Sequence, residues 1–126
     1  MLHAKASFSG ISVNDLKKAK EFYAEKLGLK LDNEEMGLQF NLPGGGSLFI
    51  YEKDNHEPAT FTVLNFLVAD IDKAVDDLME NGVTFKKYEG FHQDEKGIAR
   101  GKEAHMGPDI AWFTDPSGNI LSVIQE

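Results

Sequence analysis

The sequence predicts an α+β fold built from two similar halves, each with the order strand, helix, strand, strand, strand. An apolar run followed by an acidic residue and a helix-like stretch occurs at 11–16 and again fifty-five residues later, at 66–71. A glycine-containing turn before an apolar strand occurs at 43–50 and again seventy-three residues later, at 116–123. Self-similarity of this kind indicates an internal repeat. The offset grows by eighteen residues, which indicates an insertion in the second half alone.

In the first half, apolar and small residues from Phe8 to Val13 predict a strand, and Asp15 is the expected N-terminal cap of a helix. Apolar residues then recur at three- and four-residue spacing as far as Leu27, which predicts an amphipathic helix. Gly28 is placed to end that helix. A strand begins at 29–31, and two more strands, 37–42 and 47–52, flank a turn at 43–46.

The second half repeats this pattern. Asp70 is the expected cap, an amphipathic helix follows, and Gly82 ends it. A strand begins at 83–85, and strands at 109–114 and 119–125 flank a proline-containing turn at 115–118. The polar segment 54–59 is the expected connection between the halves. We therefore expect a single domain over 1–126, with module one at about 5–53 and module two at about 60–126.

The inserted segment, about 89–108, contains four glycines and fits no regular period. Loops of this length inside compact domains are usually functional lids or poorly ordered segments. Phe91, Ile98 and Met106 give the segment apolar anchors, which favours a lid.

Composition excludes several classes of function. The chain has no cysteine, which excludes disulfides, zinc-thiolate sites and thiol catalysis. The net charge of -8 argues against nucleic acid as a partner, because binding to phosphate needs clustered Lys and Arg. No apolar run approaches the length of a membrane span, and the first residues lack the apolar core of a secretion signal. These features predict a cytoplasmic protein with no membrane partner.

Three segments carry a resemblance to a known family. They are the strand-to-helix step at 13–16, Phe22-Tyr23 before the Leu-Gly-Leu at 27–29, and the C-terminal hairpin at 112–119. In this order and spacing they are similar to the vicinal oxygen chelate superfamily, which includes glyoxalase I, extradiol dioxygenases, and fosfomycin and bleomycin resistance proteins. The resemblance runs from about Lys5 to Gln125. It implies a glyoxalase-like fold, in which paired βαβββ modules form a cupped mixed sheet around the ligand or metal, and it implies a homodimer.

The resemblance also locates the metal ligands of metal-dependent relatives. Counting from the acidic helix caps gives Phe8 and Val63, and counting from the Asp-Pro turn and the repeat offset gives Ser122 and Phe49. Metal sites of this family need imidazole nitrogens and carboxylates, and of these four residues only Ser122 has a weakly suitable hydroxyl. We therefore expect a member of the family without the usual metal ligands and without a cofactor.

These positions define a candidate binding site. If Phe8, Phe49 and Trp112 point inward, the cup is lined by aromatic rings, which favours planar or apolar small molecules. For Trp112, a place in the core and a place in the pocket are both open. Polar residues are expected to orient the ligand. The candidate ligand-binding residues are Phe8, Phe49, Val63, Asn65, Trp112, Ser122, Arg100 and His105.

The leading hypothesis is a metal-free binding protein for a small apolar or aromatic molecule, as bleomycin resistance proteins are for their drug. The alternative is a glyoxalase- or dioxygenase-like lyase, isomerase or oxygenase with relocated catalytic residues in the insertion. That alternative rests on His92 and His105 with Glu103, Asp94 or Glu95, which have the chemistry of a metal site or an acid-base pair. A sensor whose ligand alters a partner surface is a third possibility. No catalytic residue is assigned, and whether the protein is an enzyme stays open.

Overall fold

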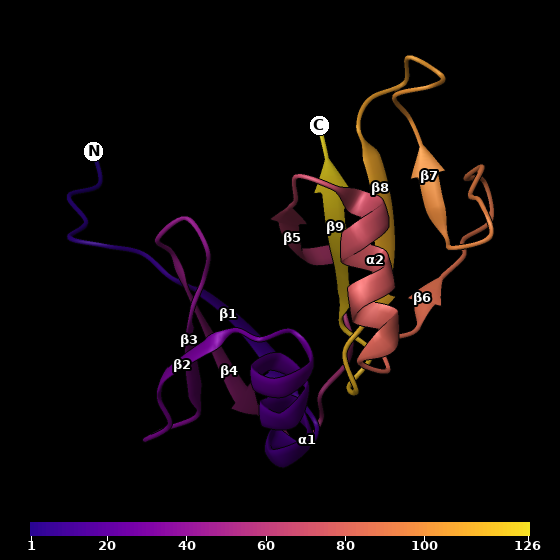
Figure 1. Ribbon diagram of the computed structural model, residues 1–126. Helices are drawn as coiled ribbons and strands as arrows, with labels where there is room; N and C mark the ends of the chain where they lie inside the picture. Colours follow the sequence, from indigo (N-terminus) through magenta and orange to yellow (C-terminus); the bar gives the residue numbers. More distant parts are fainter. The chain divides into compact units, whose positions relative to one another are not determined.

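The computed structural model describes residues 1–126 and divides the chain into two compact units, Met1–Pro58 and Ala59–Glu126 (Figure 1). The division falls within the polar segment 54–59. That the two units form one domain stays a prediction.

The first unit has one four-stranded sheet with the strand order β1-β4-β3-β2. Strand β1 is parallel to β4, and the other neighbours are antiparallel. The helical segment, which lies between β1 and β2 along the chain, covers one face of this sheet (Figure 1). The elements are β1 (Ser9–Val13), α1 (Leu16–Lys20), the π-helix η1 (Glu21–Lys26), β2 (Lys30–Asn33), β3 (Leu38–Asn41) and β4 (Ser47–Glu52).

The second unit has the equivalent strand order, β5-β9-β8-β6, again with its first strand parallel to its last. Helix α2 packs against β8 and β9. This arrangement confirms the predicted α+β class, and the second half has the predicted order of elements with one additional strand, β7. The elements are β5 (Thr62–Leu67), α2 (Ile71–Glu80), β6 (Phe85–Lys86), β7 (Ile98–Arg100), β8 (Asp109–Thr114) and β9 (Ile120–Gln125).

The first turn of each helix is held by the same two kinds of contact. Asp15 and Asp70 accept hydrogen bonds from the backbone N–H three residues later, each at 3.1 Å, which confirms both predicted caps. A side chain near the end of the last strand holds a second backbone donor. Glu52 accepts from the N–H of Leu16, and Gln125 accepts from the N–H of Ile71, both at 2.9 Å. Two of the free donors at each helix start are thereby satisfied.

The helical segment of the first unit differs from α2 because it changes to a π-helix after Lys20. Gly28 is thirteen positions after Asp15, whereas Gly82 is twelve positions after Asp70. A π-type turn accommodates one extra residue within a helix without changing where the helix begins and ends. Both glycines have positive φ, 74° and 87°, which fits their predicted role of ending each helix.

Each unit buries the sheet face that its helical segment covers. In the first unit, Val13, Phe40 and Ile50 are fully buried beneath α1 and η1. In the second unit, Phe113 and Leu121 are fully buried beneath α2. Phe40 and Phe113 are equivalent positions of the repeat, so the two cores are built on the same plan.

The insertion is more regular than the sequence indicates. Residues 98–100 form β7, which pairs with Asp109–Ala111 of β8 directly beside the segment that pairs with β6. Gly97, with a φ of 90°, forms the tight turn that leads into this strand. The prediction of no regular structure over 89–108 is therefore wrong for this part, because three residues are too few to show a period of two. No helix of the chain is both long and apolar enough to span a bilayer.

Candidate functional site

The sheet face of the first unit that no helix covers carries aromatic side chains. Glu52 reaches the start of α1, so by alternation along β4 the side chains of Phe49 and Tyr51 lie on the opposite face. Phe49 stacks on Tyr51 with ring centroids 6.0 Å apart. Phe8 meets Phe49 edge-on at 6.4 Å, although 68% of its surface remains exposed. The structure thus brings the predicted site residues Phe8 and Phe49 together.

The strand register aligns Phe49 in a row of side chains that crosses this face. The row runs from Gly10 on β1 through Phe49 on β4 and Gln39 on β3 to Asn33 on β2. Asn33 donates a hydrogen bond to the Gln39 side chain at 3.1 Å. This first-unit row therefore holds one aromatic ring and one amide pair.

The second unit has a row at the equivalent positions. Gln125 reaches the start of α2, so by alternation along β9 the side chain of Ser122 lies on the helix-free face. Its register partners extend the row to Asn65 on β5, Trp112 on β8 and Lys86 on β6. The structure thus brings the predicted residues Asn65, Trp112 and Ser122 into one row.

Trp112 lies on this helix-free face and is also mostly buried, at 9% exposure. Two aromatic residues that come shortly after β6 cover it. Tyr88 meets the indole edge-on with centroids 5.7 Å apart, and Phe91 packs at 4.9 Å. Of the two alternatives for Trp112, the structure excludes a place beneath the helix. These two rings contribute to its burial.

Asn65 and Ser122 form a polar pair beside Trp112. The fully buried Ser122 hydroxyl donates a hydrogen bond to Asn65 Oδ1 at 2.5 Å. Val63, the remaining apolar residue of the predicted site, lies at an irregularity of β5 between Thr62 and Leu64 and has no register partner on β9.

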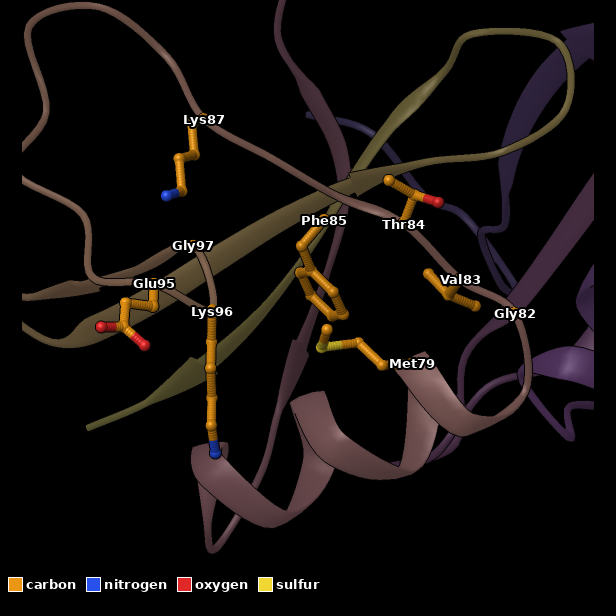
Figure 2. Close-up of a pocket in the computed structure, with 9 residues that line it drawn as sticks. All are labelled: Met79, Gly82, Val83, Thr84, Phe85, Lys87, Glu95, Lys96 and Gly97. Atoms are coloured by element: carbon orange, nitrogen blue, oxygen red, sulfur yellow. The ribbon is translucent and has the colours of Figure 1, made fainter.

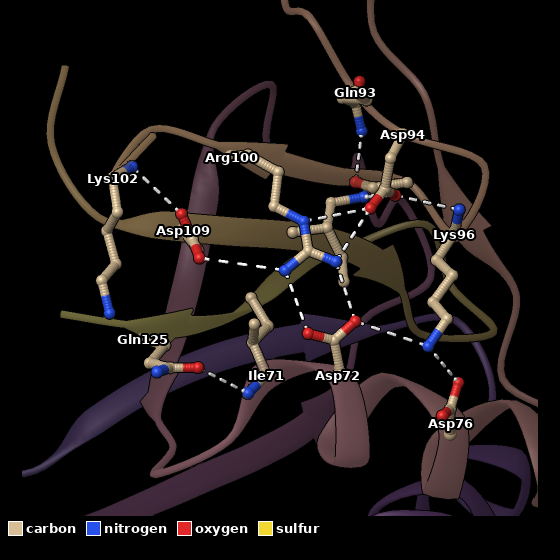
Figure 3. Close-up of polar contacts among 12 residues, drawn as sticks. Ile71, Asp72, Asp76, Gln93, Asp94, Lys96, Arg100, Lys102, Asp109 and Gln125 are labelled. Carbon is tan, nitrogen blue, oxygen red and sulfur yellow. Dashed lines mark hydrogen bonds and ion pairs between the residues drawn. The ribbon is translucent and has the colours of Figure 1, made fainter. Parts of the chain in front are cut away.

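Arg100 lies apart from this row, on the side of the sheet that α2 covers (Figure 3). Its guanidinium makes two hydrogen bonds to Asp72 of α2, at 2.8 and 3.0 Å, and one to Asp94 at 3.1 Å. Asp109, its register partner on β8, lies 3.9 Å away. Because its charge is matched by these carboxylates, we leave Arg100 out of the proposed site.

This ion-pair cluster, formed by Asp72, Asp94, Arg100 and Lys96, ties the insertion to α2. Hydrogen bonding to Arg100 is the main cause that lowers the pKa of Asp72 to about 2. Burial acts to raise the pKa of Asp94, but hydrogen bonds from the Ile98 N–H and Arg100 outweigh it and leave that pKa below its usual range. Lys96 adds a contact of 2.9 Å to Asp76 on α2. Strand β7 and the turn before it are thereby fixed to the helix.

The polar residues behind the enzyme hypothesis do not gather. His92, His105, Glu103 and Glu95 are all exposed, and Asp94 is occupied by the ion-pair cluster. No group of three or more His, Asp or Glu side chains is close enough to hold a metal ion. His105 has a positive φ of 53° in the tight turn that follows β7, so its backbone role there is structural.

The residues at the family's metal positions do not fit a metal ion. Phe8 and Phe49 contact each other through their rings, and Val63 has only an apolar side chain. Ser122 offers a hydroxyl, which is already engaged with Asn65. The four positions supply neither imidazole nor carboxylate, the donors that a divalent transition metal needs.

A cavity of about 270 Å³ lies elsewhere in the second unit, between the end of α2, β6 and the turn before β7 (Figure 2). Met79 and Phe85 form an apolar floor, and Lys96 extends along one side toward α2. The Lys96 ammonium is held by Asp76 and Asp72. None of the eight predicted ligand-binding residues lines this cavity.

One contact near the first-unit row was missed from the sequence. Ser12 and His56 are hydrogen-bonded through the hydroxyl and Nδ1 at 2.7 Å. His56 lies in the connecting segment and is half-buried. Its backbone N–H also bonds to Lys53, which is itself bonded to Val13. The segment therefore folds back on β1, which no local sequence pattern indicates.

Comparison with known proteins identifies the family. The family model described as "Glyoxalase/Bleomycin resistance protein/Dioxygenase superfamily" matches residues 3–123. The chain belongs to this superfamily. Superfamily membership confirms the resemblance drawn from the three sequence segments, and it supports small-molecule binding as the general level of function.

Individual proteins are similar to this chain over most or all of their length. YraH of Bacillus subtilis (strain 168) is 31% identical over 88% of this chain and 90% of its own. The structure of TnmS3, an antibiotic binding protein from Streptomyces sp. CB03234, has a TM-score of 0.69 and 25% identity, covering 99% of this chain and 98% of that one. A superfamily member from Sphaerobacter thermophilus DSM 20745 has a TM-score of 0.70 and 27% identity, with both chains fully covered.

Proposed function

We propose that this protein binds a small apolar or aromatic molecule without a metal ion, on the helix-free faces of its sheets. The proposal rests on one observation: each of the two rows contains an aromatic side chain. Phe49 stands in the first-unit row and Trp112 in the second-unit row. Aromatic faces favour flat, apolar ligands, and a few polar groups nearby fix their orientation.

The surroundings of Trp112 support this proposal. Phe91 is 56% exposed while it packs against the indole, so an apolar edge remains open to a ligand. Leu67 is 68% exposed on β5, on the same face as Asn65. Exposed apolar groups that gather on one face mark a binding surface more often than singly scattered ones do. The comparison with TnmS3 agrees, since that protein is described as an antibiotic binding protein.

Titration with naphthalene, followed by NMR, tests the proposal. Trp112 is the chain's single tryptophan, so its indole N–H gives one assignable signal. We expect that signal to shift saturably, and to shift equally in the presence of a chelator. No saturable shift, or binding that requires an added divalent metal, would overturn the proposal.

Substitution of the aromatic residue locates the binding surface. Trp112→Leu should weaken naphthalene binding by about threefold to tenfold in calorimetry, because an aromatic pair contributes about 0.5–1.5 kcal/mol beyond its buried area. Phe61→Leu is the matched control, since Phe61 is 67% exposed. Equal affinity in Trp112→Leu and the unaltered protein would place the binding surface elsewhere.

We also propose that the protein is a homodimer, on the ground of its family membership alone. Sedimentation velocity tests this, because a dimer has twice the mass of the 14.0 kDa chain. A single species of monomer mass at micromolar concentration would contradict it.

A further inference from the structure

We propose that the ligand of the second-unit row is a planar aromatic molecule bearing an acceptor oxygen, of the aryl ketone or aryl carboxylate class. This inference rests on the proposed function and names the ligand class for the same surface. It follows from the side chains of Asn65, Trp112 and Lys86, whose free polar groups are all hydrogen-bond donors.

Asn65 is oriented by its neighbour. The Ser122 hydroxyl is fully buried and donates to Asn65 Oδ1, so the oxygen of the amide is the end that is occupied. The side-chain nitrogen makes no hydrogen bond within the chain, and Asn65 is exposed. An amide nitrogen carries two donors and no acceptor. The pair therefore presents a fixed N–H group toward whatever lies on this face.

Trp112 provides a second donor. The indole N–H is a donor only, and it makes no hydrogen bond within the chain. No buried polar side-chain atom of the protein lacks a partner, so this N–H reaches solvent despite the low exposure of the residue. Aromatic stacking and a donor are thereby available from one side chain.

Lys86 completes the row. It is the register partner of Trp112 on β6, it is exposed, and its ammonium forms no ion pair. The row contains no carboxylate, although the chain as a whole has a net charge of -8. A ligand whose polar group accepts hydrogen bonds matches this row. A ligand whose polar group only donates would leave these groups without partners, which is costly once water is excluded.

A matched pair of probes tests the inference. The compounds 2-acetonaphthone and 2-isopropenylnaphthalene have the same shape and differ only in a carbonyl oxygen in place of a methylene group. We expect the ketone to bind about threefold to tenfold more tightly in calorimetry, because its oxygen accepts a hydrogen bond that the methylene group cannot accept. The Trp112 indole N–H and the Asn65 side-chain amide signals should both shift on adding the ketone.

The variant Asn65→Asp removes the hydrogen-bond donor while keeping the hydrogen bond from Ser122 that holds the side chain. A carboxylate still accepts from Ser122, but it replaces the N–H₂ donor with an acceptor. We expect this variant to lose the preference for the ketone and to bind the hydrocarbon as before. Asn55→Asp makes the same change of charge on an exposed residue of the connecting segment and should keep the preference.

The outcomes distinguish this inference from the proposed function. If both probes bind equally and Asn65→Asp changes nothing, the inference fails while the proposed function stands. If neither probe shifts the Trp112 signal saturably, the proposed function fails and the inference with it. Retention of the ketone preference in Asn65→Asp would also overturn the inference.

Discussion

The first-unit row and the second-unit row occupy equivalent positions on sheets of the same strand order, but their aromatic and polar side chains stand on different strands. In the first unit the aromatic ring is on the last strand, at Phe49, and the amide pair is on the adjacent strand β3 and on β2 beyond it. In the second unit the polar pair of Asn65 and Ser122 is on the first and last strands, and the ring is on the next strand, at Trp112.

This difference teaches that the repeat conserves the backbone and the core while it leaves the helix-free face free to vary. Glu52 and Gln125 hold the helix starts in the same way, and Phe40 and Phe113 fill the same core position. The ion-pair cluster and β7 belong to the second unit alone. Substitutions at paired positions therefore show which features the units share.

The largest effect is expected in the cores. Phe40→Ala and Phe113→Ala should each lower the free energy of unfolding by about 3–5 kcal/mol, because each removes a fully buried ring. Urea unfolding followed by circular dichroism measures the change. Phe61→Ala, at an exposed ring, should stay within about 0.5 kcal/mol. A cost below about 1 kcal/mol in only one unit would break the equivalence of the two cores.

A smaller effect is expected where the units differ. Arg100→Met should lower the free energy of unfolding by about 1–2 kcal/mol, since it removes charged hydrogen bonds to Asp72 and Asp94. The matched control is Lys20→Met in the first unit, which breaks an exposed pair with Glu34 at 2.9 Å. That control should cost less than about 1 kcal/mol. Equal costs would show that the cluster contributes no more than a surface pair.

The helix caps should behave alike. Asp15→Ala and Asp70→Ala each remove one hydrogen bond to a helix start and should each cost about 1 kcal/mol in urea unfolding. Replacement by Ser, which also caps helices, should recover most of the stability. A cost in one unit only would mean that the π-helix of the first unit changes how its start is held.

The smallest effect is expected on the stability of the fold at acidic pH. The pKa of Asp72 is about 2 in the folded chain and 3.8 when unperturbed, so its ion pair stabilises the fold above pH 4. That stabilisation is lost as the pH falls from about 4 to 2. Because Asp72 is half exposed, the loss should be less than about 1 kcal/mol. Arg100→Met should show a flatter pH dependence across this window, and an unchanged slope would exclude Asp72 as its source.

The fold was predictable wherever the signals are local. The caps at Asp15 and Asp70 and the glycines that end the helices are read from neighbouring residues, and all were confirmed. The roles of Glu52 and Gln125 were missed because each side chain acts on a helix far away in the sequence. The repeat offsets carried that signal, since both residues and both helix starts are related by them.

The site was predictable only in part, because strand phase decides which way a side chain points. Phe49, Asn65, Trp112 and Ser122 lie on helix-free faces, as their places in strands of five or more residues allow, and Phe8, just before β1, contacts Phe49. Arg100 lies in a strand of three residues, where no alternation is visible. Its direction is set by pairing with Asp109, which a linear pattern does not reveal.

Strand β7 has a consequence for the behaviour of the protein in concentrated solution. Together with β6 it occupies the outer edge of β8 from Asp109 to Phe113. An unoccupied strand edge is a template on which other molecules add strands and aggregate. A version of the chain with the insertion shortened would therefore expose hydrogen-bonding groups beside a hydrophobic core, and it would lose solubility before it lost its fold.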